Sequence, residues 1–200
     1  MIRRPAPALL LALCLGLVGC AGAEERPDDP GPTRAEPAGR GMTPEAIAFA
    51  VHRRVNAIRT DFGLKPLAWN DALVPIARNH SADMAHRDYF AHQSPEGNGP
   101  LQRYAAGGYR CRVPITSHRF ATGGENLALS NLYIGFRIHG DGRREPYGAR
   151  SARAVAERIV EGWMNSPGHR DNLLRPYWRT EAIGVVIDAR GRVYATQNFC

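Results

Sequence analysis

The C-terminal end of the chain carries the pattern that restricts the fold most. Two apolar runs, 182–188 and 192–199, flank the short segment Ala189-Arg190-Gly191. Runs of this length, rich in β-branched and aromatic residues and joined by a link that contains glycine, are typical of a β-hairpin. A hairpin needs another layer to cover its apolar face, and the residues before it have to supply that layer.

Amphipathic helices precede the hairpin. Thr43-Pro44-Glu45 is a strong helix start, and apolar residues then recur at helical spacing as far as Gly63. A second helix is predicted to end near Tyr89-Phe90, with its inner face formed by Leu73, Ile76 or Ala77, His80 and Met84. We expect the second and later helices to begin at Asn70 or Asp71, at Pro100 and at Ser151. A chain in which helices come first and a hairpin comes last is predicted to form an α+β layered domain.

The segment 131–150 interrupts this order. Its apolar part, 132–139, predicts an extra strand, followed by a turn at Gly140-Asp141-Gly142 and a polar loop over 143–150. The pattern of this segment indicates no function.

A histidine lies at a break between two helical segments in the stretch 163–174. Pro167 cannot continue the interior of the preceding helix, and Gly168 permits backbone angles that are closed to other residues. His169 is therefore held at a corner, where an imidazole can act as a ligand or as an acid–base group. The alternative is that His169 only caps the turn.

Three further histidines, His80, His86 and His92, are spaced six residues apart. Six residues turn a helix through about 600°, so neighbours lie on different faces and a shared metal site is disfavoured. We expect His80 to be a hydrogen-bonded core histidine, His86 to lie on the surface, and His92 to lie where the helix gives way to a loop. Glu125 follows a glycine turn and serves either a functional site or only the start of a helix.

The N-terminus has the order of a bacterial export signal. Arg3 and Arg4 precede the apolar run 8–18, which is too short to cross a bilayer as a permanent helix. Leu17-Val18-Gly19-Cys20 resembles a lipobox, in which cleavage before the cysteine is followed by acylation at that residue. An ordinary secretory peptide is the alternative. We therefore expect a lipoprotein signal peptide (1–19), a lipidated Cys20 with a disordered proline-rich tether (20–42), and one domain (43–200).

The expected location is the bacterial cell envelope, facing the periplasm or the exterior, with the membrane as a partner through Cys20. The chain has 26 Lys and Arg against 19 Asp and Glu, a net charge of +7 that falls to +5 once Arg3 and Arg4 are removed with the signal. The arginines are scattered and no nucleic-acid motif accompanies them, so we expect no nucleic-acid partner.

Four cysteines are present, of which Cys14 leaves with the signal and Cys20 carries the lipid. Cys111 and Cys200 remain in a compartment that permits oxidation, and we predict a disulfide between them. Two free thiols are the alternative.

Six motifs occur in one order between residues 44 and 199: His80-Ser81-Ala82-Asp83-Met84-Ala85, Tyr89-Phe90-Ala91-His92, Gly124-Glu125-Asn126-Leu127-Ala128, the stretch 163–174, Ile183-Gly184-Val185 and Thr196-Gln197-Asn198-Phe199. Together they resemble the bacterial branch of the CAP superfamily, the cysteine-rich secretory, antigen 5 and pathogenesis-related proteins, whose domain is also called SCP. The resemblance implies an α-β-α sandwich, with a small, mainly antiparallel sheet between helical layers and a cleft on one side.

The resemblance also implies a site. The family's cleft holds two histidines and two glutamates, which can bind a divalent metal such as zinc. The matching positions are His92, Glu125 and His169, as ligand-binding residues and as metal ligands. The second glutamate has no counterpart, because Met164-Asn165-Ser166 follow Trp163. The loss of one carboxylate removes a ligand and a general base, which weakens a hydrolase mechanism.

These observations favour a lipid-anchored CAP domain that binds a ligand without catalysis, the ligand being a lipid, a small hydrophobic molecule, or a cell-wall or envelope-protein component. The alternative is a metal-assisted hydrolase or protease, in which His92 and His169 hold the ion and Glu125 is the third ligand or the base. A third hypothesis is an adhesion or structural role with no chemistry in the cleft. Ser94 and Ser166 lie near histidines but lack the context of a nucleophile elbow. A carboxylate close to both histidines would favour the hydrolase, and an apolar groove beside the cleft would favour lipid binding.

Overall fold

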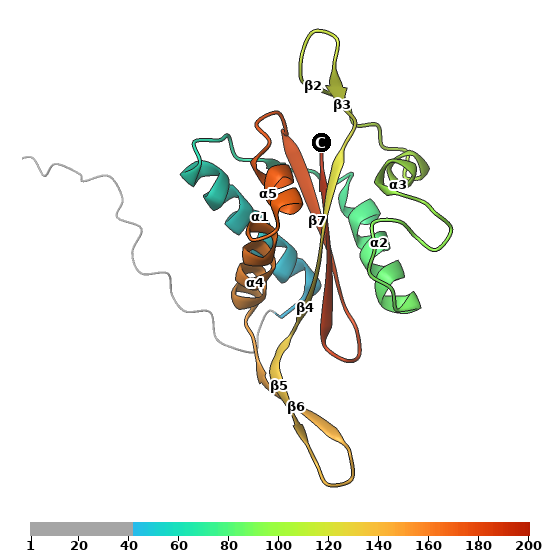
Figure 1. The fold of residues 1–200 in the computed structure, drawn as a ribbon, viewed down its shortest axis with the longest axis vertical. Coiled ribbons are helices and arrows are strands. Elements are labelled where there is room, and N and C mark those ends of the chain that lie inside the picture. Colours follow the sequence, from blue (N-terminus) through green and yellow to red (C-terminus); the bar gives the residue numbers. More distant parts are fainter. Residues whose placement is uncertain (1–41) are drawn as a thin grey trace, which may run out of the picture. The chain divides into compact units, whose positions relative to one another are not determined.

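The computed structural model describes residues 42–200, so the predicted signal peptide, Cys20 and the tether up to residue 41 lie outside the described residues. The elements, shown in Figure 1, are α1 (Pro44–Asp61), β1 (Ala68–Trp69), α2 (Val74–Arg87), α3 (Pro100–Ala106), β2 (Val113–Pro114), β3 (Phe120–Ala121), β4 (Gly124–Asn131), β5 (Tyr133–Ile138), β6 (Arg144–Ala149), α4 (Ala152–Met164), α5 (Pro167–Leu174), β7 (Thr180–Ile187) and β8 (Arg192–Phe199). Among the described residues, no helix has the length and apolar character needed to cross a membrane.

A four-stranded sheet lies at the centre, in the order β1-β7-β8-β4. The predicted C-terminal hairpin is confirmed: β7 and β8 pair in antiparallel register, with Ile187 opposite Val193. β4 pairs with β8 in the same sense, and only β1 runs parallel to its neighbour. The sheet is therefore small and mainly antiparallel, and β4 forms one of its edges.

Helices cover both faces of this sheet, which confirms the α-β-α sandwich. α1 packs against β7 and α4, α4 and α5 pack against β4, and α2 packs against β7 and β8 from the opposite side. Gly184 of β7 permits this last contact, because a Cβ there would lie 2.1 Å from the backbone nitrogen of Arg78. Residues 42–200 thus enclose their own core, which includes Val51, Ile159, Trp163 and Ile183.

Two of the three predicted capping positions are confirmed. Thr43 and Ser151 accept hydrogen bonds from the third residue after them, at 3.1 and 3.2 Å, as predicted. The second helix begins later than predicted, at Val74, because the Asn70 side chain accepts a hydrogen bond from the Ala72 N–H in a turn ahead of the helix. It ends at Arg87, since Asp88 adopts a left-handed conformation with φ of 56°.

Two expectations about secondary structure were wrong. Residues 143–150 do not form a polar loop, because Arg144–Ala149 pairs as β6 with β5 in a separate two-stranded sheet. Glu125 does not begin a helix, because Gly124–Asn131 pairs along its full length with β8. Glu125 is therefore a strand residue, and it does not stabilise a helix macrodipole.

The predicted disulfide is confirmed. Cys111 and Cys200 are bonded, with their Cα atoms 5.5 Å apart and a sequence separation of 89 residues. The bond joins Cys200, the residue after β8, to the segment between α3 and β2. It therefore fixes the end of the sheet on which the cleft is built.

We expect the Cys111→Ala/Cys200→Ala variant to lose about 2–5 kcal/mol of unfolding free energy, because the open chain gains the entropy that the closed loop removes. Urea denaturation of both proteins without reductant measures this difference. Equal midpoints and slopes for the two proteins would contradict the expectation.

Candidate functional site

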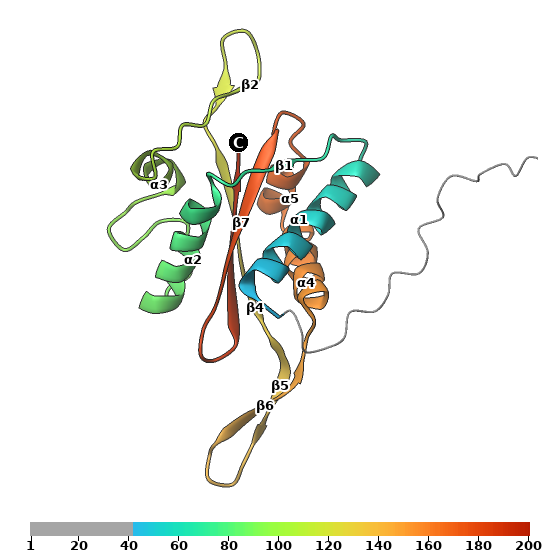
Figure 2. The same ribbon diagram turned by 180° about the vertical axis from the view of Figure 1, so that it is seen from behind.

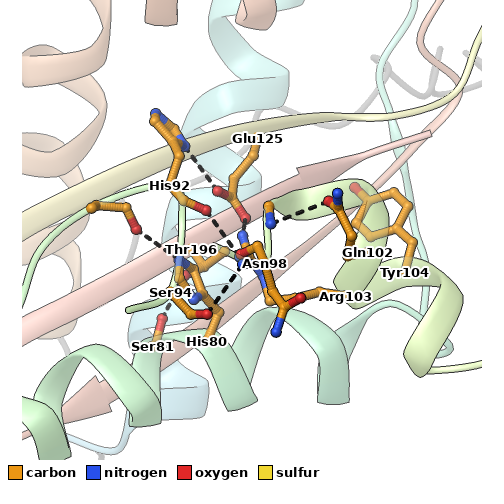
Figure 3. Close-up of polar contacts among 12 residues, drawn as sticks. His80, Ser81, His92, Ser94, Asn98, Gln102, Arg103, Tyr104, Glu125 and Thr196 are labelled. Carbon is orange, nitrogen blue, oxygen red and sulfur yellow. Dashed lines mark hydrogen bonds and ion pairs between the residues drawn. The ribbon is translucent and has the colours of Figure 1, made fainter. Parts of the chain in front are cut away.

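Glu125 is the buried centre of the candidate site. It lies on the edge strand β4, and its side chain is only 1% exposed. One carboxylate oxygen, Oε1, lies 2.8 Å from His92 Nδ1, and the other, Oε2, accepts a hydrogen bond of 2.6 Å from Arg103 (Figure 3). A buried carboxylate needs such partners, since an unpaired charge away from water is costly. Each oxygen of the Glu125 carboxylate thus has a partner within the protein.

Arg103 also fixes the loop that carries His92. From α3 its guanidinium donates hydrogen bonds of 2.9 Å to the His92 carbonyl and 2.8 Å to the Asn98 carbonyl, as Figure 3 shows. One planar guanidinium therefore holds both the backbone of His92 and the carboxylate that His92 contacts. Sequence reasoning missed Arg103, because it is one of many scattered arginines and lies 22 residues from its carboxylate.

His80 supports the same loop from below. It is buried, as predicted, and its Nε2 lies 3.0 Å from the carbonyl oxygen of Ala91, the residue before His92. Burial lowers the pKa of His80, and the nearby Glu125 carboxylate opposes this shift. His80 is therefore neutral near pH 7 and acts as a positioning residue. His86 is exposed, as predicted.

His169 reaches the cleft from the other helical layer. It is the third residue of α5, and its ring centroid lies 6.4 Å from that of His92. Burial lowers the pKa of His169, and the electrostatic effect of the neighbouring His92 lowers it further. The structure thus brings the three predicted residues together around the β4 edge, but the Glu125 carboxylate binds His92 rather than His169.

Side-chain amides from the motifs that resemble the CAP superfamily hold α5 in place. Asn172 donates to the Glu125 carbonyl at 3.1 Å and to the Asn126 side-chain oxygen at 3.0 Å, and Asn126 donates to the His169 carbonyl at 3.2 Å. Asn126 also donates to Gln197 of β8, at 3.0 Å. These contacts give a physical reason for Asn126, Asn172 and Gln197 in their motifs: they set the position of His169.

The same chain of hydrogen bonds continues away from the cleft into the sandwich. Gln197 donates to Glu181 of β7, and Glu181 Oε1 lies 2.6 Å from His52 Nδ1 on α1. Glu181 is fully buried. This second buried carboxylate joins α1 to the sheet, and nothing in the sequence pattern indicated it.

A groove of about 350 Å³ runs beside His169 along the outer edge of β4. Its walls combine apolar side chains with a few polar ones, and the helix α4 faces it with a glycine, Gly162, whose Cβ position is open space. The lining residues are Phe90, Leu127, Ala128, Leu129, Ser130, Asn131, Arg158, Ile159, Gly162, Trp163, Ser166 and His169. The cleft therefore opens into an amphipathic groove.

The donor set does not fit a three-ligand metal centre as it is arranged. Within residues 42–200, no group of three or more His, Cys, Asp or Glu side chains is placed to hold an ion. Both oxygens of Glu125 are engaged, and the guanidinium of Arg103 would repel a dication. Glu157 and Glu161, the acids that precede Trp163 on α4, are exposed.

Comparisons with known proteins agree with this architecture. The profile of the cysteine-rich secretory protein family, called CAP, matches residues 52–199. Among curated relatives, the uncharacterised protein YkwD of Bacillus subtilis is 29% identical over 83% of this chain and 54% of its own length, and the uncharacterised membrane protein YlbC of the same organism is 32% identical over 72% and 31%. The chain thus spans about half or less of these relatives.

Two solved structures share the fold. An extracellular protein of Bacillus anthracis that contains an SCP domain superposes with a TM-score of 0.54 at 25% identity, over 80% of this chain and 44% of that one. An outer surface protein of Borrelia burgdorferi superposes with a TM-score of 0.54 at 17% identity, over 78% and 91%.

We expect Arg103→Met to lower the free energy of unfolding by about 3 kcal/mol, because Glu125 would be left as a buried charge without its cation. Arg103→Met/Glu125→Gln should recover much of that loss. Arg153→Met is the matched control, since Arg153 pairs with Glu157 on the exposed surface and should cost less than about 0.5 kcal/mol. Equal losses for Arg103→Met and Arg153→Met in urea denaturation would contradict the assignment.

We expect His92→Gln to raise the pKa of His169, because it removes the neighbouring positive charge while the amide can still donate to Glu125. The pKa of His169 should stay below that of an ordinary histidine, since burial is the larger cause. NMR titration of the imidazole resonances measures both shifts. The His80 resonance is the internal control, and a parallel change there would point to a general structural effect.

Proposed function

Because this chain belongs to the cysteine-rich secretory protein (CAP) family, we propose that it is an exported binding module of the bacterial envelope, tethered through lipidated Cys20. In this proposal the groove between His169 and β4 takes up a lipid or another small amphipathic molecule of the envelope, without catalysis. Export is supported by the structural relatives, which are named as extracellular and outer surface proteins.

The state of Glu125 is the observation that carries the non-catalytic part of the proposal. A general base or metal ligand needs a free lone pair directed at the substrate or ion. Both oxygens of Glu125 are instead directed at His92 and Arg103, at 2.8 and 2.6 Å. The carboxylate is also only 1% exposed, so it acts as an internal counter-charge to Arg103 and does not face the cleft as a base or ligand would.

The groove supports the choice of ligand. Phe90 and Leu129 are large apolar side chains that remain exposed on its walls, and they offer an acyl or isoprenoid chain a surface to cover. Arg158 and His169 stand beside this apolar surface and can bind an anionic or hydrogen-bonding head group. A molecule with an apolar tail and a small polar head matches both.

The alternative, a metal-assisted hydrolase, has one observation in its favour. Burial lowers the pKa of His169, so its imidazole is neutral near pH 7 and can accept a proton or bind zinc. Under our proposal, the imidazoles of His92 and His169 bind zinc or another divalent metal weakly at most. A cell-wall or envelope-protein ligand remains an outcome of the experiment below.

We expect native mass spectrometry of the protein, extracted from the membranes of a bacterial host without chelators, to show a co-purifying amphipathic molecule. Gly162→Leu should abolish its binding, because the new side chain fills open space in the groove while a leucine suits a helix interior. Glu161→Leu is the matched control, since it adds the same side chain to α4 at an exposed position outside the groove.

The proposal fails if Gly162→Leu and Glu161→Leu retain the molecule equally, or if the wild-type protein carries none. Stoichiometric zinc that is lost in His92→Ala and His169→Ala would favour the hydrolase instead.

A further inference from the structure

The β5–β6 hairpin is a second exposed feature, and the site described above does not use it. Its strands pair with each other and with no other described strand, and Figures 1 and 2 show the hairpin projecting beyond the end of the sandwich. Its base is anchored: the Leu132 N–H donates to the Gly191 carbonyl at 2.8 Å, and the Arg150 N–H donates to the Leu132 carbonyl at 2.9 Å. The hairpin is thus a fixed projection that the core does not cover.

Large apolar side chains lie exposed on both faces of this hairpin. Ile134 and Ile138 share one face, and they are 62% and 73% exposed. Tyr147 lies opposite Gly135 on the other face and is 49% exposed. A protein that docked against one face would leave the other face in water. Insertion of the hairpin into an apolar medium covers both.

The hairpin also carries cations that are not neutralised by carboxylates. The guanidinium of Arg137 lies 6.0 Å from the ring centroid of Tyr147, and that of Arg144 lies 4.5 Å from the ring centroid of Phe136. No carboxylate among the described residues lies within 4.0 Å of either guanidinium. Glu145, the residue opposite Arg137, instead contacts His139 at 2.8 Å.

A hollow at the base of the hairpin extends this cationic surface. Arg144 and Arg190 line it together with Tyr133, Phe136 and Pro146. The combination of guanidinium groups with aromatic and apolar walls matches the boundary of a membrane, where anionic head groups lie directly above the acyl chains.

We propose that the β5–β6 hairpin docks onto an anionic lipid bilayer, with Ile134, Ile138 and Tyr147 entering the head-group boundary and Arg137 and Arg144 bound to lipid phosphates. Apolar burial and electrostatic attraction together determine the strength of such interfacial binding. The place of the hairpin is consistent with this role. α1 begins at the same end of the sandwich as the hairpin (Figures 1 and 2), so the described part of the chain starts on the side that would face the bilayer.

Flotation with lipid vesicles tests the proposal on residues 42–200, a unit that encloses its own core and disulfide and that lacks Cys20. The unit should float with vesicles that contain phosphatidylglycerol and much less with pure phosphatidylcholine. Raising the salt concentration from roughly 0.1 to 1 M should weaken the binding, because screening shortens the reach of the arginine charges.

Two hairpin variants locate the contact. Ile134→Ser/Ile138→Ser and Arg137→Ser/Arg144→Ser should each weaken vesicle binding by at least about tenfold. The matched controls are Leu101→Ser, an exposed apolar residue of α3, and Arg53→Ser/Arg54→Ser, two exposed arginines of α1. All four variants change exposed side chains, so circular dichroism should show unchanged folding and thermal midpoints.

The proposal is overturned if the wild-type unit does not float with anionic vesicles, or if hairpin and control variants bind equally well. It is also overturned if the hairpin crosslinks to an envelope protein in cells while the unit does not bind to vesicles. These outcomes are separate from ligand binding in the groove, which Gly162→Leu tests.

Discussion

The pairing of Glu125 with Arg103 is the interaction on which the site depends. A carboxylate on the edge strand is buried beneath the cleft, and it is stable there because a guanidinium and an imidazole take up its two oxygens. The same guanidinium binds the carbonyls of His92 and Asn98, so α3, the loop after α2 and the sheet are joined at one point. Asn172 binds the backbone of Glu125 from the opposite layer. Two helical layers therefore meet around one residue.

In this arrangement, the residues that support the cleft differ from the residue that lies at the mouth of the groove. Glu125, Arg103, Asn126 and Asn172 are engaged with one another and with the backbone, which makes them parts of a rigid frame. This frame holds His169 at the mouth of a groove, where burial and the neighbouring His92 both lower its pKa. In the proposed function, this frame pre-organises the groove and so reduces the entropy lost when the ligand binds.

Some of this architecture could be predicted from the sequence. The apolar runs at 182–188 and 192–199 indicated the hairpin, and the motifs around His92, Glu125 and His169 indicated the cleft. Arg103 was not found, because the partner of a buried charge is chosen in three dimensions and leaves no periodic signal. β6 was missed for a related reason: every residue of Arg144–Ala149 is exposed, so the strand has no buried face to produce an alternating pattern. No pattern in the sequence indicated that the β5–β6 hairpin lies at the end of the sandwich.

We propose that Arg103 keeps divalent metals out of the cleft, because its guanidinium is bound to the carboxylate that a metal would need. Calorimetric titration with zinc tests this role in the wild-type protein and in Arg103→Gln, which keeps hydrogen-bond donors but removes the charge. We expect weak zinc binding by the wild type and tighter binding by the variant, with His92 and His169 required for the gain. Tight stoichiometric binding by the wild-type protein, unchanged or weakened in Arg103→Gln, would contradict it.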